Sequence, residues 1–384
     1  MNKKFNKYIT YFIIANICFI QFLSTKTFAQ EPIEILSQSA ILMDSKTGNI
    51  LYEYNCDKKL APASLTKIMS LILIFENIEK GNLLEDELLT CSEYANSING
   101  SQIWLDKGEE MSVKDLLKAV IISSANDATV VFAEKIAGSE QNFVNMMNER
   151  AKLMKLKSTQ FKNCTGLDAD NQFTTAKEVA IMACELLKHE KIFEYTKIWM
   201  TELRNGKTKL VNTNKLIRFY PGTNGLKTGT SDNAGCCLAA SATRDELSLI
   251  SVVMGAQNTE DRFHMSKMLL NYGFDNYVYV EPEDIQSKLH NLKVEKGEEE
   301  YVGLKANKPN KILVEKTKIN NIVQEIKLPK KICAPILENQ IIGTVTVTVN
   351  KNKMLEYPII ASKNVNKINF INAFKRLILN ITNI

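Results

Sequence analysis

A serine and a lysine three positions apart, Ser64 and Lys67, stand at the start of a strongly apolar segment. Residues i and i+3 share a helix face, so Lys67 can reach the Ser64 hydroxyl. Serine attacks a carbonyl only after a base takes its proton, and lysine is such a base if burial and the helix dipole lower its pKa. By itself the pair also fits a helix cap followed by a snorkelling lysine, which is the simpler interpretation.

Two further motifs carry polar groups suited to acyl transfer. Ser124 and Asn126 lie in "SSANDA", where residues that favour turns interrupt a helical pattern. Lys227 begins "KTG", just before a strand that starts near Gly235. Gly229 in this motif would let a ligand lie close to the strand backbone. The three motifs could therefore supply a nucleophile (Ser64), a base (Lys67) and a fixed cation for a carboxylate (Lys227), so acyl transfer would need no histidine.

The elements that must position these motifs alternate between strand and helix patterns. Residues 40–55 are typical of a β-hairpin, and residues 235–255 contain two more apolar runs joined by a polar turn. Between them, apolar residues three and four apart predict helices over Ser64–Glu79, Ser112–Ile122, Ala128–Ala137, Glu140–Leu156 and Thr175–Lys188. We therefore expect an α+β domain over residues 33–276, with one sheet built from both ends and an inserted helical region.

The composition changes after this domain. Residues 277–363 are rich in Val, Ile, Lys and Glu, and several Pro and Gly interrupt them, which predicts a small all-β domain. Residues 364–384 place apolar side chains at helical spacing beside Lys367, Lys375 and Arg376. This pattern predicts an amphipathic helix at the membrane surface, too polar to span the membrane. A terminal helix docked on the protein itself is the alternative.

Residues 1–29 are typical of a secretory signal peptide: Lys3, Lys4 and Lys7 precede an apolar stretch, and small residues follow it around Ala29. A membrane-anchoring first helix is the alternative. We expect the mature chain at the outer face of the cytoplasmic membrane or in the cell wall. Its seven cysteines include no C-x-x-C pair, so neither a disulfide framework nor a zinc site is predicted. Adjacent Cys236 and Cys237 are interpreted as buried strand residues.

Charge and histidine content narrow the function further. The formal net charge is only +5, and no basic stripe with interleaved aromatic residues is present, so nucleic acid is not an expected partner. The three histidines, His189, His264 and His290, lie away from the motifs in sequence, which argues against a Ser-His-Asp triad. No metal or cofactor is expected.

The three motifs together match a known signature. Ser-x-x-Lys, Ser-x-Asn and Lys-Thr-Gly, in this order, mark β-lactamases and penicillin-binding proteins. In detail, "PASLTKIM", "SANDA" and "GLKTGTSDNAGCCLAA" make the chain resemble the low-molecular-mass D-alanyl-D-alanine carboxypeptidases, from about Ser39 through the β domain and tail. Ala125 stands where that family often has Gly. The resemblance implies a β-lactamase/transpeptidase-like catalytic domain.

The resemblance also implies roles for individual residues. Ser64 would attack the carbonyl between the two terminal D-alanines of a peptidoglycan stem peptide while Lys67 takes its proton, and Ser124 would pass a proton to the leaving amine. The substrate-binding residues implied are Asn126, Lys227, Thr228, Gly229 and Thr230. Backbone N–H groups of Ser64 and Thr230 would form the oxyanion hole. β-Lactams are expected to acylate the same serine as inhibitors.

Three other functions remain open at this stage. A β-lactamase shares the serine and lysine but in class A needs a separately placed glutamate for deacylation, and nothing between Ala137 and Thr201 picks one out. A nucleotide-binding loop in "GTNGLKTG" is disfavoured because Leu226 stands where a P-loop has glycine. A catalytically silent wall-binding relative is the third alternative.

Overall fold

The computed structural model describes residues 33–307 and 310–382. The predicted signal peptide, residues 1–29, lies outside the described residues. No helix in the described part of the chain is both long and apolar enough to cross a membrane.

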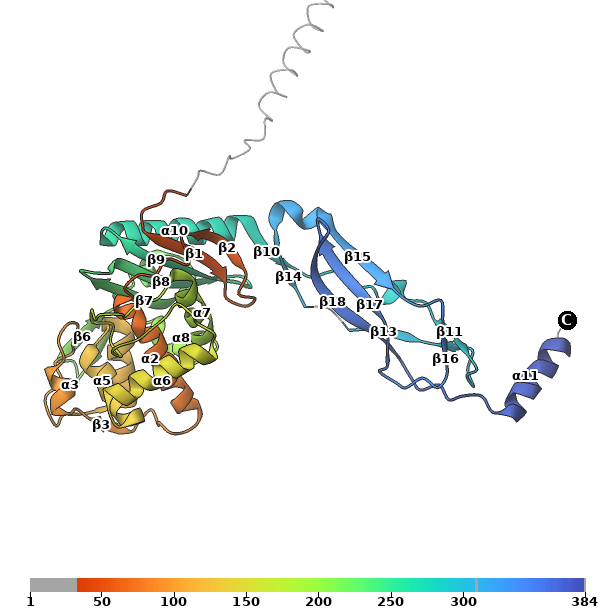
Figure 1. The fold of residues 1–384 in the computed structure, drawn as a ribbon, viewed down its shortest axis with the longest axis horizontal. Helices are drawn as coiled ribbons and strands as arrows, with labels where there is room; N and C mark the ends of the chain where they lie inside the picture. The colour runs from red at the N-terminus through yellow and green to blue at the C-terminus, as the bar shows by residue number, and fades with distance from the viewer. Residues whose placement is uncertain (1–32, 308–309, 383–384) are drawn as a thin grey trace, which may run out of the picture. The chain divides into compact units, whose positions relative to one another are not determined.

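A five-stranded antiparallel sheet forms the centre of the first domain, with strand order β2-β1-β9-β8-β7 (Figure 1). Its strands are β1 (Ser39–Asp44), β2 (Ile50–Tyr54), β7 (Thr223–Ser231), β8 (Gly235–Arg244) and β9 (Leu247–Ala256). The first two strands come from the start of the domain and the last three from its end, because the helical region is inserted between them. The predicted α+β class and the sheet built from both ends are confirmed. Strand β7, which carries the third motif, lies at an edge of the sheet.

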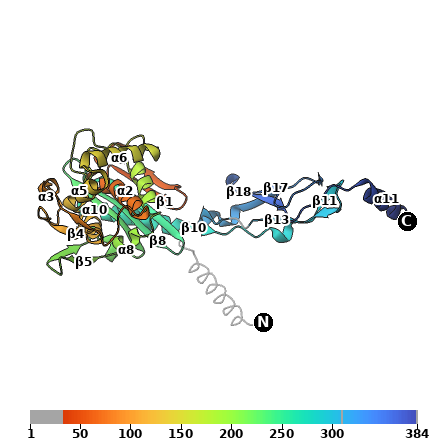
Figure 2. The same cartoon turned by 90° about the horizontal axis from the view of Figure 1, so that it is seen from below.

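Both faces of the sheet are covered by helices (Figures 1 and 2). Successive strand residues point to opposite faces. On β1, Leu42 lies against Gly273 of α10 (Thr259–Asn276), whereas Met43 contacts Cys184 of α7 (Ala176–Leu186). The sheet is therefore buried on both sides. Helix α10 was not predicted from the sequence, although Asn258 caps it and two acidic residues occupy its first turn.

The inserted region supplies the main hydrophobic core, which α2 crosses. The chain enters α2 through a 3-10 turn, Ala63–Thr66, so the α-helix begins at Lys67 and not at Ser64 as predicted. The helix predicted over residues 112–122 is regular only to Lys118 and then widens into a π-helical turn, Ala119–Ser123. The helices are α2 (Lys67–Glu79), α3 (Glu93–Ser97), α4 (Val113–Lys118), α5 (Asn126–Ala137), α6 (Glu140–Leu153), α7, α8 (Ile192–Thr196) and α9 (Leu216–Phe219).

Two short antiparallel strand pairs complete this region, β3 (Leu88–Thr90) with β4 (Glu110–Ser112) and β5 (Met200–Leu203) with β6 (Thr208–Val211).

From Tyr277 onward the described chain consists mainly of strands and has a hydrophobic core of its own. These strands are β10 (Tyr277–Val280), β11 (Leu292–Glu295), β12 (Tyr301–Val302), β13 (Leu304–Ala306), β14 (Ile312–Glu315), β15 (Ile322–Lys327), β16 (Lys331–Cys333), β17 (Ile341–Val349) and β18 (Asn352–Ala361). Helix α11 (Phe370–Thr382) follows, and its apolar Phe370, Phe374 and Leu377 are exposed to solvent.

Candidate active site

The Ser64 hydroxyl and the Lys67 amine lie in contact at the entry to α2, with 3.1 Å between Ser64 Oγ and Lys67 Nζ. The 3-10 turn still places residues three apart on one side, because 3-10 geometry eclipses i and i+3. Ser64 is partly exposed, whereas Lys67 is completely buried. The serine is therefore accessible to a substrate from outside, while the amine behind it is shielded from water.

Burial sets the protonation of Lys67. Desolvation lowers the pKa of its amine from the usual 10.5 to about 7, and the nearby thiol of Cys164 and carboxyl of Asp127 oppose this shift only in part. Asn126 Oδ1 and the Thr165 carbonyl oxygen each lie 2.6 Å from Lys67 Nζ. These acceptors are neutral, so they orient the amine without holding its proton as a carboxylate would. At neutral pH a substantial fraction of Lys67 is a free base.

The second motif enters the site where the helical pattern breaks. Ser124 has a left-handed backbone (φ 66°) between the π-helical turn and α5, and its buried Oγ has no hydrogen-bond partner. Asn126, at the start of α5, reaches Lys67 with its Oδ1 and donates its Nδ2–H to the Asn99 carbonyl at 2.7 Å. A buried hydroxyl without a partner is costly, so Ser124 is poised for a group that a ligand would bring.

The third motif adds a second buried amine. Lys227 is 2% exposed, and its Nζ donates to the Thr228 carbonyl at 3.1 Å. The Thr228 hydroxyl in turn donates to Thr213 Oγ1 at 2.8 Å. Desolvation, and then repulsion by Lys67, lower the Lys227 pKa well below its usual value. Lys227 stands two residues before Gly229, which packs against the turn that carries Ser64, so the first and third motifs meet in one site.

Gly229 lies where β7 approaches the Ser64 turn. A Cβ atom at this position would lie 3.0 Å from the Ser64 backbone nitrogen and 3.1 Å from the Ala63 Cβ. In the described structure the close neighbour of Gly229 is thus the Ser64 backbone, whereas the sequence suggested a ligand. The contact brings the Ser64 N–H beside the strand that carries Thr230.

Arg262 is a functional candidate that the sequence reasoning missed. It lies on α10, is 7% exposed, and donates to the Gly229 carbonyl at 3.0 Å and to Thr230 Oγ1 at 2.9 Å. In the described part of the chain no carboxylate forms an ion pair with Lys67, Lys227 or Arg262. Three buried basic side chains without a carboxylate partner make a site that an anion would suit, because its charge favours their protonated forms. The capped acidic start of α10 was the sequence signal for a helix here.

The loop that carries the Thr165 carbonyl was also not recognised from the sequence. Gly166 in this loop has φ +89°, and a Cβ there would come within 1.9 Å of the Ala63 carbonyl oxygen, so only glycine fits. The loop therefore packs directly against the turn that carries Ser64.

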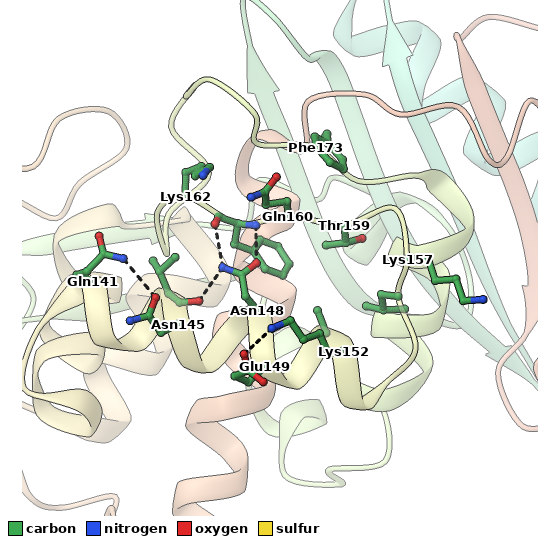
Figure 3. A pocket seen from close by; sticks show the side chains of 14 residues that line it. Gln141, Asn145, Asn148, Glu149, Lys152, Lys157, Thr159, Gln160, Lys162 and Phe173 are labelled. Carbon is green, nitrogen blue, oxygen red and sulfur yellow. Dashed lines mark hydrogen bonds and ion pairs between the residues drawn. The ribbon is translucent and has the colours of Figure 1, made fainter.

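Asn148 on α6 anchors the start of this loop, as Figure 3 shows. Its Oδ1 accepts the Phe161 N–H at 2.9 Å and its Nδ2 donates to the Phe161 carbonyl at 3.0 Å. The hollow in this view has a volume of about 660 Å³ and is lined by α6 and residues 156–162 with Phe173. None of the motif residues lines it.

In the described part of the chain, no histidine or cysteine side chain hydrogen-bonds to Ser64, Lys67 or Lys227. His189 is buried beside Glu79, with 2.6 Å between its Nδ1 and Glu79 Oε1. The seven cysteines that the structure describes are all free thiols, and Cys236 and Cys237 are buried in β8 as expected for apolar strand residues.

Comparison with known proteins agrees with this geometry. Residues 25–258 match the family described as D-alanyl-D-alanine carboxypeptidase, and residues 283–367 match the C-terminal domain of penicillin-binding protein 5. The chain is 40% identical to the D-alanyl-D-alanine carboxypeptidase DacF of Bacillus subtilis over 344 residues, which is 88% of each protein. It is 33% identical to DacC of Escherichia coli, over 90% of this chain and 88% of the relative.

Solved structures give the same result. Penicillin-binding protein 5 from Haemophilus influenzae matches with a TM-score of 0.75 and 31% identity, over 88% of this chain and 99% of that one. The ampicillin-bound form of penicillin-binding protein D2 from Listeria monocytogenes matches with a TM-score of 0.56 and 31% identity, over 63% of this chain and 99% of that one. The expected transpeptidase-like fold is confirmed. The chain belongs to the D-alanyl-D-alanine carboxypeptidase family, among the low-molecular-mass penicillin-binding proteins.

Proposed function

We propose that this protein removes the terminal D-alanine from peptidoglycan stem peptides through an acyl-enzyme on Ser64. The observation that carries the proposal is the contact of 3.1 Å between Ser64 Oγ and a fully buried Lys67 whose pKa is about 7. A general base works best when its pKa lies near the working pH. Lys67 meets that condition and has the nucleophile within reach.

In the first half-reaction, Ser64 Oγ attacks the carbonyl carbon of the penultimate D-alanine, and its proton passes to Lys67. The oxyanion is stabilised by the N–H groups of Ser64 and Thr230, an interaction worth about 3 kcal/mol for one donor. The C–N bond then breaks, Ser124 relays a proton to the departing amine, and D-alanine leaves. Water hydrolyses the remaining ester with Lys67 again as base, which releases the shortened peptide and frees Ser64.

The remaining motif residues bind the substrate. Lys227 and the Thr228 hydroxyl hold the terminal carboxylate, whose charge restores the Lys227 proton that burial disfavours. Asn126 has a second Nδ2 hydrogen for the substrate amide. Arg262 supports this region by holding the Gly229 carbonyl and the Thr230 hydroxyl in place.

Carboxypeptidase activity is favoured over β-lactam hydrolysis by the surroundings of the serine. Within the described residues, no glutamate hydrogen-bonds to Ser64 or Lys67; their partners are each other, Asn126 and Thr165. Glu178, between the second and third motifs, instead accepts from Ser158 and Thr159. We therefore propose that penicillins acylate Ser64 and leave slowly, as inhibitors.

The test is mass spectrometry of a pentapeptide muropeptide incubated with the purified protein. The expected product has lost one alanine. A matched Ser64→Ala variant should release none, and fluorescent penicillin should label the wild type but not the variant. Penicillin labelling without loss of alanine would contradict the carboxypeptidase proposal.

We further propose export of the chain after cleavage of residues 1–29, a catalytic domain over residues 33–276 and a β domain over 277–363 that acts as a spacer. The tail, residues 364–384, would adsorb to the outer face of the cytoplasmic membrane. Support comes from α11, on which Phe370 is 85% exposed and Leu377 58% exposed. Arg376 donates to the carbonyl groups of Gly297 and Glu298, so the helix is held without burying this apolar face.

Flotation with anionic lipid vesicles tests the membrane proposal. The wild type should float with the vesicles, whereas Phe374→Asp should remain in solution with its penicillin labelling unchanged. Equal flotation of both proteins would contradict it.

A further inference from the structure

Trp104 combines two properties that rarely occur together. Its side chain is 75% exposed to solvent, and its backbone has φ +52°. Bulky residues avoid positive φ because the Cβ atom crowds the backbone. Among the described residues, Trp104 is the one aromatic residue in this conformation. Other non-glycine residues with positive φ include Ala63, which precedes Ser64, and Ser124, which belongs to the second motif.

The backbone on both sides of Trp104 is held by buried or paired charges. The N–H groups of Ile103 and Leu105 each donate to a carboxylate oxygen of Asp127 at 3.1 Å, and Asp127 is 1% exposed. Arg204 donates to the Ile103 carbonyl at 2.8 Å and to the Trp104 carbonyl at 3.2 Å. Such strain persists only where surrounding contacts enforce it, and it concentrates at functional sites.

The same segment forms a wall of the active site. Asn126 donates its backbone N–H to the Ser101 carbonyl and its Nδ2–H to the Asn99 carbonyl, each at 2.7 Å. A Cβ on Gly100 would lie 2.6 Å from Asn126 Nδ2. Trp104 follows Ser101 by three residues, so its Cα lies within about 11 Å of that of Ser101. The segment that carries the exposed indole therefore forms the rim of the site beside Asn126.

We propose that Trp104 is a substrate-binding subsite whose indole packs against the side chain of the stem-peptide residue just before D-Ala-D-Ala. This rests on the proposed function. One extended residue spans about 3.3 Å, so that residue falls within reach of the rim while the sugar, several residues further on, does not. The class of side chain that fits is a long aliphatic chain ending in an amine, because its methylene groups cover the indole and its charge favours the ring face.

Kinetics on two N-acylated tripeptides test the subsite, one with lysine and one with alanine before D-Ala-D-Ala. Trp104→Ala should lower kcat/KM for the lysine peptide about three- to tenfold. It should change kcat/KM for the alanine peptide, and the rate of acylation by fluorescent penicillin, less than twofold. Trp104→Phe should keep most of the activity on the lysine peptide. Equal losses on both peptides and penicillin would reveal a structural role and overturn the proposal, as would no loss at all.

A binding measurement separates this proposal from the proposed function. The chain has two tryptophans, and Trp199→Phe leaves Trp104 as the one remaining tryptophan, which can be excited apart from the tyrosines. In a Ser64→Ala, Trp199→Phe protein, the lysine peptide should change the Trp104 emission and the alanine peptide should change it much less. A wild type that cleaves neither peptide would contradict the proposed function, and this titration would then decide the subsite alone. A change seen only with sugar-bearing substrates would assign the indole to the glycan and overturn the proposal.

Discussion

Lys67 Nζ lies 2.6 Å from Asn126 Oδ1, although the two residues are 59 positions apart in the chain. An amide oxygen accepts a hydrogen bond from the amine but carries no net charge. Desolvation therefore remains the dominant effect on Lys67, and its pKa stays near 7. Under the proposed mechanism, the identity of residue 126 therefore affects the pH range in which Lys67 can activate Ser64.

Replacing this amide by a carboxylate should move the pH dependence of acylation. In the wild type, the rate of labelling by fluorescent penicillin should rise about tenfold per pH unit below 7 and level off above it, because only the neutral amine accepts the Ser64 proton. In Asn126→Asp the new negative charge raises the Lys67 pKa, so the rise should shift upward by about 1–3 pH units. Asn126→Ser, which adds no charge, serves as the control. An unshifted profile in the Asp variant would exclude Lys67 as the titrating base.

Lys67 should also lower the stability of the protein in a pH-dependent way. The pKa of the folded state is about 7, below the usual 10.5, so burial of the charged amine costs most below pH 7 and the cost disappears as pH rises toward 10.5. Lys67→Met removes this cost. The gain in unfolding free energy should be larger at pH 6 than at pH 10, by roughly 3–5 kcal/mol.

Urea unfolding at the two pH values measures this difference. Lys157→Met, at an exposed lysine, is the matched control and should show no such pH dependence. A pH-independent effect of Lys67→Met would mean that the amine is not desolvated as the structure indicates.

Arg262 should contribute to binding of the substrate's terminal carboxylate, in addition to any contribution to folding. Its guanidinium fixes the Gly229 carbonyl and the Thr230 hydroxyl, and it keeps positive charge beside Lys227. Hydrogen bonds to charged groups contribute about 1.5–3 kcal/mol, so Arg262→Met should reduce kcat/KM for the peptide about 10- to 100-fold. Arg262→Lys should recover part of that loss by restoring the charge. If kcat/KM of Arg262→Lys is no higher than that of Arg262→Met, the positive charge at position 262 does not contribute to substrate binding.

Asn148 should stabilise the loop that carries the Thr165 carbonyl. Asn148→Ala leaves both the N–H and the carbonyl of Phe161 without a side-chain partner, which should cost about 1–3 kcal/mol of unfolding free energy and slow penicillin acylation. The neighbouring Asn145, whose Oδ1 accepts from the Gln141 side chain at the surface, provides the control, and Asn145→Ala should change stability by less than about 0.5 kcal/mol. Equal effects of the two variants would remove the proposed link between α6 and the site.

The features that the sequence alone could predict depend on residues that lie close together along the chain. Ser64 and Lys67 are three residues apart, and any helical turn, α or 3-10, brings such residues to one side. The apolar periodicity of α2 likewise determined that the lysine would be buried, since almost every residue beside it belongs to the core. The α+β class followed from strand patterns at both ends of the domain, and the three motifs in order identified the family.

Contacts between distant segments were decided only by the tertiary structure. The meeting of Lys67 with Asn126 and with the Thr165 carbonyl depends on how α2, α5 and the Gly166 loop pack, and no local pattern encodes those distances. Arg262 reached β7 because α10 covers one face of the sheet, and that helix was not recognised. The proximity of Lys227 to Lys67 has the same origin. Folding joins positions that are far apart in sequence, and the lowered pKa values arise only once that packing excludes water.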